Sequence, residues 1–279
     1  MLRIELRKAL SGPAFKIAFI TACALVLWHI VIIYGLMQQL YLEAAPGRFT
    51  GKYNLFYWWL PIDCISAPYA FFYGLFPMLA CLPYAWSYMS ERNSKYEYQM
   101  ITRSSSKQYY LAKYMAVFLS GGIVIAVPLA IDLAAAALFA PAMRPNIFFS
   151  MPGFSREGFL TPVYYSHPWI FCFAVLTMEF LWGSSIASLS FTFVTAFKSS
   201  FLGVVMPVAA IYVWDIFAAF VRGIYTYYTG NYLEFSILKL LHTCTNNPNP
   251  AWLQLTIIAI LCTISALSTI AIAARKDKL

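Results

Sequence analysis

Charged residues are scarce in this chain of 279 residues. Asp, Glu, Lys and Arg together make up 11% of it, whereas a soluble domain carries about 25%. Hydrophobic residues make up 61%, and the mean hydropathy is +0.68. This balance excludes a protein whose main solvent is water, and it indicates one membrane domain spanning residues 1–279.

The sequence also lacks the motifs of common enzyme chemistry. It contains no GxxxxGK[ST] phosphate loop, no HExxH and no GxSxG, and the six cysteines include no CxxC pair. We therefore expect no catalytic residue, metal or cofactor in this chain, so any energy source belongs to another protein. Cys64 and Cys244 fall in predicted outer loops, where a disulfide between them and two unpaired thiols both stay open.

Long apolar runs occupy most of the chain instead. Each has about 20 residues, the length that crosses ~30 Å of hydrocarbon as a helix. The pattern predicts an all-α membrane protein with six transmembrane helices and no internal repeat. The predicted spans are about 17–37, 69–89, 115–141, 169–197, 201–220 and 252–274.

The basic residues gather on one side of these spans. Of the 19 Lys and Arg, thirteen fall at the two termini and in the second and fourth connections. Because cytoplasmic loops hold the excess of positive charge, both termini are predicted to be cytoplasmic, in a bacterial plasma membrane. The net charge of +8 lacks the aromatic-interleaved basic face of nucleic-acid binders, so we expect membrane lipids and no nucleic acid as partners.

Two short segments are predicted to lie at the interface. In residues 1–14, apolar positions share one helical face, and Arg3, Arg7 and Lys8 lie largely off it. This predicts an amphipathic helix on the cytoplasmic surface, although a basic anchor that only sets topology explains the same residues. Between the fifth and sixth spans, Ile237 and Leu240 lie at helical spacing in a run too short to cross, which predicts a re-entrant or interfacial helix.

The connection between the second and third spans is the most informative polar stretch. It begins with a short, charged segment that is predicted to be helical. A turn, Thr102 to Lys107, follows, and then an aromatic and aliphatic run that ends at Lys113. The full stretch reads Ser90-Glu91-Arg92-Asn93-Ser94-Lys95-Tyr96-Glu97-Tyr98-Gln99-Met100-Ile101-Thr102-Arg103-Ser104-Ser105-Ser106-Lys107-Gln108-Tyr109-Tyr110-Leu111-Ala112-Lys113.

This stretch resembles the corresponding loop of ABC-2 type permeases, the membrane subunits of ABC exporters. There, a Glu-led helical segment precedes a Thr-x-(Pro/Ser)-x-Ser-(Arg/Lys) turn and a run that ends in Lys. The predicted chain plan, with an amphipathic start, six spans and a basic tail, is similar over nearly the whole length. Two departures are Ser104, where Pro is common, and Lys95-Tyr96, where the family often has Gly-Thr.

The resemblance implies a function for the loop. In that family the loop helix docks on a separate ATPase, and two ATPase subunits, which bind ATP and Mg, drive a pair of permeases. Glu91 is then implied to brace the loop against Arg7 or Lys8. Charged side chains around an aromatic centre suit a docking surface, although a solvated loop that only sets topology is also consistent. The implied coupling residues are Glu91, Arg92, Lys95, Tyr96, Glu97, Tyr98 and Arg103.

Four ionisable residues fall inside predicted spans that hold no Lys or Arg: His29, Asp132, Glu179 and Asp215. A charge at membrane depth is costly, so each is a candidate for the translocation pathway. His29 falls ~18 Å into the first span and Glu179 falls ~15 Å from the outer end of its span, depths similar enough to make a His29–Glu179 pair one hypothesis. Asp132 and Asp215 fall in the outer halves of their spans, which is consistent with an acidic vestibule on the outer side. An equally good interpretation of each residue is a helix-packing group whose hydrogen bonds go to neighbouring hydroxyls.

Two functions are consistent with these features. The first, implied by the resemblance, is the permease subunit of an ATP-driven exporter, working with a second copy or a paralogue. Its substrate is expected to be a peptide or another amphipathic or hydrophobic molecule, in peptide-antibiotic export or immunity. The alternative is a proton- or ion-coupled secondary transporter, in which His29, Glu179 and Asp215 relay protons. The absence of an internal repeat disfavours this alternative.

Overall fold

The computed structural model describes residues 1–43, 54–63, 66–103, 105–145, 160–230, 234–241 and 251–276. Every regular element in these ranges is a helix, so the all-α prediction is confirmed. Cys64 and Cys244 lie outside the described residues. The helices are α1 (Leu2–Ser11), α2 (Pro13–Glu43), η1 (Leu55–Tyr57), α3 (Ala67–Cys81), α4 (Ser87–Asn93), α5 (Tyr96–Arg103), α6 (Ser106–Phe139), α7 (Thr161–Ser166), α8 (Pro168–Phe197), α9 (Ser200–Thr229), α10 (Ile237–Leu241) and α11 (Ala251–Lys276).

Within the described ranges, five helices are long and apolar enough to cross a membrane. They are α2, α6, α8, α9 and α11, and they match the first and the third to sixth predicted spans. The second predicted span, 69–89, is interrupted. Helix α3 has 15 residues, which gives ~22 Å of rise, and turns at 82–86 separate it from α4. Pro83 lies in that break, where its missing N–H and ring end a helix.

Helices α6 and α8 form the centre of the molecule because small residues let their backbones approach closely. A Cβ atom added at Gly121 of α6 would lie 2.3 Å from the Cβ of Ala187 and 3.0 Å from the carbonyl oxygen of Gly183 on α8. A Cβ at Gly122 would lie 2.3 Å from Oγ of Ser184. The two helices therefore meet at positions that no larger side chain fits.

Helix α11 is joined to this centre by hydroxyl groups. Ser265 of α11 bonds to Ser188 of α8 at 2.9 Å and to the hydroxyl of Tyr114 of α6 at 3.1 Å. Further along, Ser268 bonds to Thr192 of α8 at 3.0 Å. Hydroxyl pairs of this kind hold apolar helices together where no hydrophobic driving force acts between them.

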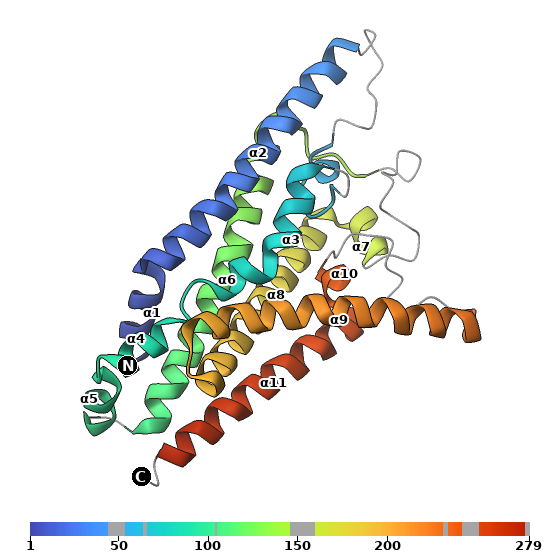
Figure 1. Cartoon of the computed structure of the whole chain (residues 1–279). Helices are drawn as coiled ribbons and strands as arrows, with labels where there is room; N and C mark the ends of the chain where they lie inside the picture. The colour runs from blue at the N-terminus through green and yellow to red at the C-terminus, as the bar shows by residue number, and fades with distance from the viewer. Residues whose placement is uncertain are drawn as a thin grey trace.

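The chain has two distinct ends (Figure 1). Both termini, α1, α4, α5 and the start of α6 lie at one end, together with the turn that joins α8 to α9. The far end of α2, α7 and α10 lie away from it, and α9 runs across the other long helices. The charged loop elements are thus gathered beside the N-terminal helix.

Candidate functional site

Four charged residues form an ionic cluster at the end that holds both termini. Glu5 and Lys8 come from α1, Glu91 from α4 and Lys113 from α6. The Nζ atom of Lys113 lies 2.5 Å from Oε2 of Glu91 and 3.6 Å from Oε2 of Glu5. The Nζ atom of Lys8 lies 3.3 Å from Oε1 of Glu91 and 3.6 Å from Oε1 of Glu5. Two carboxylates and two ammonium groups therefore balance each other and connect three helices.

The ionic cluster is largely shielded from solvent. The side chains of Glu5 and Lys113 are 0% exposed and that of Glu91 is 13% exposed. A buried ion pair is stable only when hydrogen bonds satisfy its remaining atoms. Here Tyr84 donates to Glu5 at 2.7 Å, and Tyr109 donates to Glu91 at 2.7 Å. Each carboxylate thus accepts a hydrogen bond from one tyrosine in addition to its contacts with the ammonium groups.

The pKa values of the cluster follow from these contacts. Burial alone would raise the pKa of Glu91, but the charge of Lys113 and the hydrogen bond from Tyr109 outweigh burial, so the pKa lies below its ordinary value. Burial alone would lower the pKa of Lys8, but Glu91 and Glu5 raise it above the ordinary value. Both groups are therefore charged at neutral pH.

The contact between Lys8 and Glu91 matches the expectation that Glu91 is braced against the N-terminal helix. Sequence reasoning did not identify Glu5 and Lys113 as members of the same cluster. A signal for Glu5 was present, because it shares a helical face with Leu2 and Ala9, and an acid on an apolar face marks a buried partner. Lys113 was placed just before the third span, whereas α6 begins at Ser106 and includes it.

Helix α5 and the end of α4 carry the other predicted coupling residues. Arg92 is half-buried and Lys95 is exposed. The ring of Tyr96 lies 4.1 Å below the ammonium group of Lys8, a cation–π contact that ties α5 to α1. Lys95 has a φ of 59°, the left-handed region that favours glycine.

Glu97 differs from its expected place on the rim of the docking surface. It is 0% exposed and accepts a hydrogen bond of 2.5 Å from Tyr110. Helix α5 is therefore attached to α6 through a buried polar contact. The backbones of Tyr98 and Arg103 belong to α5, and their side chains lie outside the described part of the chain. On α1, Arg3 and Arg7 are exposed, as predicted for the polar face of an interfacial helix.

His29 of α2 lies between two carboxylates. Its Nδ1 atom is 2.9 Å from Oδ1 of Asp132 on α6, and its Nε2 atom is 3.2 Å from Oδ2 of Asp63. The predicted His29–Glu179 pair is therefore wrong. Depth along each helix was similar, but the sequence does not give the direction in which each side chain points. Asp63 is not among the predicted candidates, because it falls outside the predicted spans.

The segment that carries Asp63 is packed into the bundle. The backbone N–H of Leu60 donates to Oδ2 of Asp132 at 2.8 Å, and the indole of Trp59 donates to the carbonyl of Leu129 at 3.0 Å. The side chains of Trp59 and Leu60 are 0% exposed. Asp132 thus fastens residues 54–63 to α6. In the described ranges no group of three or more His, Cys, Asp or Glu is arranged to hold a metal ion.

Glu179 and Asp215 have partners of their own. Tyr73 of α3 donates to Glu179 of α8 at 2.8 Å, and Glu179 is 0% exposed. Ser236 donates to Asp215 of α9. His29, Glu179 and Asp215 thus have different hydrogen-bond partners. Of the four candidate pathway residues, the structure brings His29 and Asp132 together and gives Glu179 and Asp215 other partners.

Comparisons with protein-family models, with curated proteins and with solved structures found no match. The arrangement of the chain's own residues therefore carries the functional argument. The ionic cluster connects α1, α4 and α6, and Tyr96 and Glu97 connect α5 to the same helices. Charged contacts to α1 and to the first turns of α6 therefore resist a displacement of the α4–α5 segment. These contacts hold the α4–α5 segment against α1 and α6.

Proposed function

We propose that this chain is the permease subunit of an ATP-driven exporter of the ABC-2 type. In this proposal the chain has six spans, the second covering about 69–89, which is most of α3, the turns at 82–86 and the first residues of α4. Both termini face the cytoplasm of a bacterial cell, and two ATPase subunits, which bind ATP and Mg, act on a pair of permeases. The chain itself holds no catalytic residue.

The ionic cluster is the observation that supports this proposal most. Lys113 lies two turns into α6, and its ammonium group contacts both Glu5 of α1 and Glu91 of α4. Breaking a buried pair of this kind costs about 3–5 kcal/mol. A push on α4 or α5 is therefore transmitted to α6 before the contact yields. Such a transmission element is required when the energy source is a separate protein.

The surface beside this cluster supplies the docking face. We assign the ATPase contact to the exposed side of residues 92–99, where Lys95 projects at the turn between α4 and α5. Tyr96 and Glu97 hold this surface in place from the inside. Substituting them by Ala would disturb the fold, so a docking test needs an exposed residue instead.

Lys95→Glu tests the docking face, and Lys198→Glu is its matched control. Both lysines are exposed and both have left-handed backbones, with φ of 59° and 52°. The tagged chain is purified in mild detergent from its own host, and the co-purified ATPase is measured by its ATP hydrolysis. We expect wild type and Lys198→Glu to retain the ATPase and Lys95→Glu to lose most of it.

Retention of the ATPase by Lys95→Glu at the wild-type level would remove residues 92–99 from the interface. If the wild-type chain carries no ATPase and moves substrate on a pH gradient alone, the chain is a secondary transporter and the proposal fails. Export is measured with amphipathic peptides as substrates, because the proposed cargo is a peptide or another amphipathic or hydrophobic molecule.

A further inference from the structure

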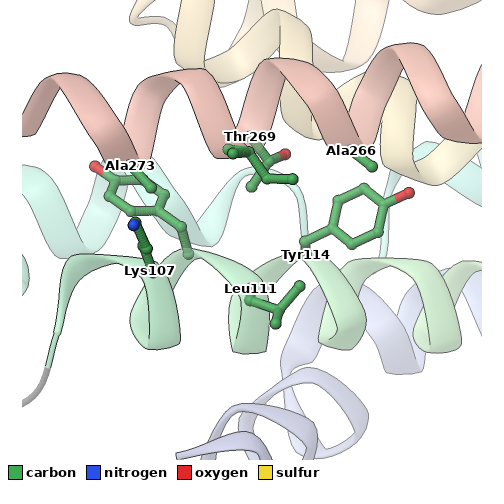
Figure 2. Close-up of a pocket in the computed structure, with 8 residues that line it drawn as sticks. Lys107, Leu111, Tyr114, Ala266, Thr269 and Ala273 are labelled. Atoms are coloured by element: carbon green, nitrogen blue, oxygen red, sulfur yellow. The ribbon is translucent and has the colours of Figure 1, made fainter.

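A groove lies between α6 and α11, close to the end that holds both termini (Figure 2). Its volume is about 310 Å³, at the lower end of the range for small-molecule sites. Along α6 it runs from Lys107 to Tyr114, which is ~10 Å of helix rise. On α11 it is bounded by Ala266 and Ala273.

The lining of the groove is almost entirely carbon, because its polar atoms are already bonded elsewhere. The hydroxyl of Thr269 donates to the carbonyl of Ser265 at 2.8 Å. The hydroxyl of Tyr114 donates to the carbonyl of Cys262 at 3.3 Å, and that of Tyr110 donates to Glu97 at 2.5 Å. Glu97 is fully buried and does not line the groove. The groove therefore offers an apolar surface without competing hydrogen-bonding groups.

Lys107 supplies the one charged group among the lining residues. It is exposed and stands at the same end of the groove as Ala273 (Figure 2). In the sequence, one residue separates Ala273 from Arg275, and Lys276 comes next. The groove thus combines an apolar slot between the start of α6 and the end of α11 with a cation at the end near Ala273. Basic pockets between membrane helices on the cytoplasmic side bind anionic lipid head groups.

We propose that this groove binds an anionic phospholipid of the surrounding bilayer. One acyl chain lies along Leu111 and Ile270, which are 57% and 56% exposed, over the floor formed by Tyr114 and Thr269. The lipid phosphate pairs with Lys107. Because the lipid contacts both helices, it holds the start of α6 and the end of α11 together. This inference does not require an ATPase.

Lipid binding is measured by native mass spectrometry of the full chain after delipidation in detergent. The probes are phosphatidylglycerol and phosphatidylcholine, added separately. Wild type is expected to bind the first phosphatidylglycerol more tightly than the first phosphatidylcholine. Lys107→Gln removes one basic contact and is expected to weaken phosphatidylglycerol binding about fivefold without changing phosphatidylcholine binding. Lys198→Gln, also an exposed lysine, is the control and is expected to match wild type.

A second pair of variants tests the apolar slot. Ala266→Phe fills the groove and is expected to weaken binding of both lipids. Leu267→Phe alters the neighbouring residue, which is 66% exposed and does not line the groove, and it is expected to match wild type.

Equal binding of both lipids by wild type would overturn the proposal. So would an unchanged phosphatidylglycerol affinity in Lys107→Gln, whose exposed position makes misfolding a poor explanation. If Ala266→Phe changed only the oligomeric state, the occupant of the groove would be a second copy of the chain and the lipid assignment would be wrong. None of these results bears on ATPase docking, which the Lys95→Glu variant tests separately.

Discussion

At the scale of single residues, the ionic cluster depends on the charge of Lys113. Its side chain is 0% exposed, and two carboxylates share its ammonium group. Lys113→Gln is expected to lower the free energy of unfolding by about 3–5 kcal/mol, because Glu5 and Glu91 lose the buried one of the two cations that contact both of them. Thermal unfolding in detergent measures this against Lys16→Gln, an exposed lysine on α2. Equal midpoints for the two variants would show that the ionic cluster does not stabilise the chain.

The shifted pKa of Glu91 predicts a loss of stability in acid. Since the folded-state pKa lies below the ordinary value, the contribution of Glu91 is fully present above about pH 4.3, its unfolded pKa, and is lost as the pH falls through the folded value. The raised pKa of Lys8 works in the opposite direction, and its contribution is lost as the pH rises above about 10.4. Wild type is expected to be more stable than Glu91→Gln at pH 7, and the difference is expected to shrink below about pH 4. A constant difference from pH 7 to pH 3 would contradict the assignment.

Lys95 stands where the resembled family often has Gly, and its φ of 59° explains that preference. A left-handed backbone costs a residue with a Cβ atom about 1–2 kcal/mol, while Gly adds entropy to the unfolded chain of about 0.4–1 kcal/mol. Lys95→Gly is therefore expected to be neutral or slightly stabilising. Lys95→Val, with a β-branched side chain, is expected to destabilise. Equal unfolding midpoints for the Gly and Val variants would remove the backbone argument.

The residues of the ionic cluster also show what the sequence can predict. The contact between Glu91 and the N-terminal helix was expected from the resemblance, and the structure has it at Lys8. The roles of Glu5 and Lys113 were not expected, because burial of a charge depends on which helices pack together. Likewise, His29 was recognised as unusual from its apolar surroundings, but its partner Asp63 comes from a segment that folds back into the bundle.

At the scale of helices, length and apolar composition were enough to locate α2, α6, α8, α9 and α11. These properties do not show where a helix breaks. The second predicted span is a continuous apolar run, yet residues 82–86, which include Pro83 and Tyr84, form turns. Tyr84 turns toward Glu5, so the break places a donor at the ionic cluster. Segment 54–63 falls between the first and second predicted spans, where aromatic residues are more often interface anchors than a ligand site.

The contact between α6 and α8 gives a prediction at this scale. Gly121→Ala places a Cβ atom 2.3 Å from that of Ala187, so the helices must move apart, at an expected cost of about 1–3 kcal/mol. Gly35→Ala on α2 meets nothing within 4 Å and is expected to be neutral or stabilising. Unfolding midpoints measured side by side check the difference. A Gly121→Ala variant as stable as Gly35→Ala would show that the two helices do not pack through Gly121.

At the scale of the whole molecule, charge and structure single out the same end. The basic residues predicted to be cytoplasmic lie near both termini, α4, α5 and the start of α6, and Figure 1 shows these segments together. The proposed ATPase face, the ionic cluster and the lipid groove all lie at this end. Membrane orientation was predicted from charge alone, and it decides whether an ATPase can reach α5.

Sided labelling of Asn93→Cys tests this orientation most directly. Asn93 is exposed at the end of α4, and the variant is made in a background without the native cysteines. A membrane-impermeant maleimide is applied to intact cells and to inverted vesicles. We expect the maleimide to label the Asn93→Cys variant in inverted vesicles and not in intact cells. A bound ATPase is expected to reduce this labelling. Labelling from outside intact cells would place α4 and α5 on the outer surface, and the proposed coupling to a cytoplasmic ATPase would be wrong.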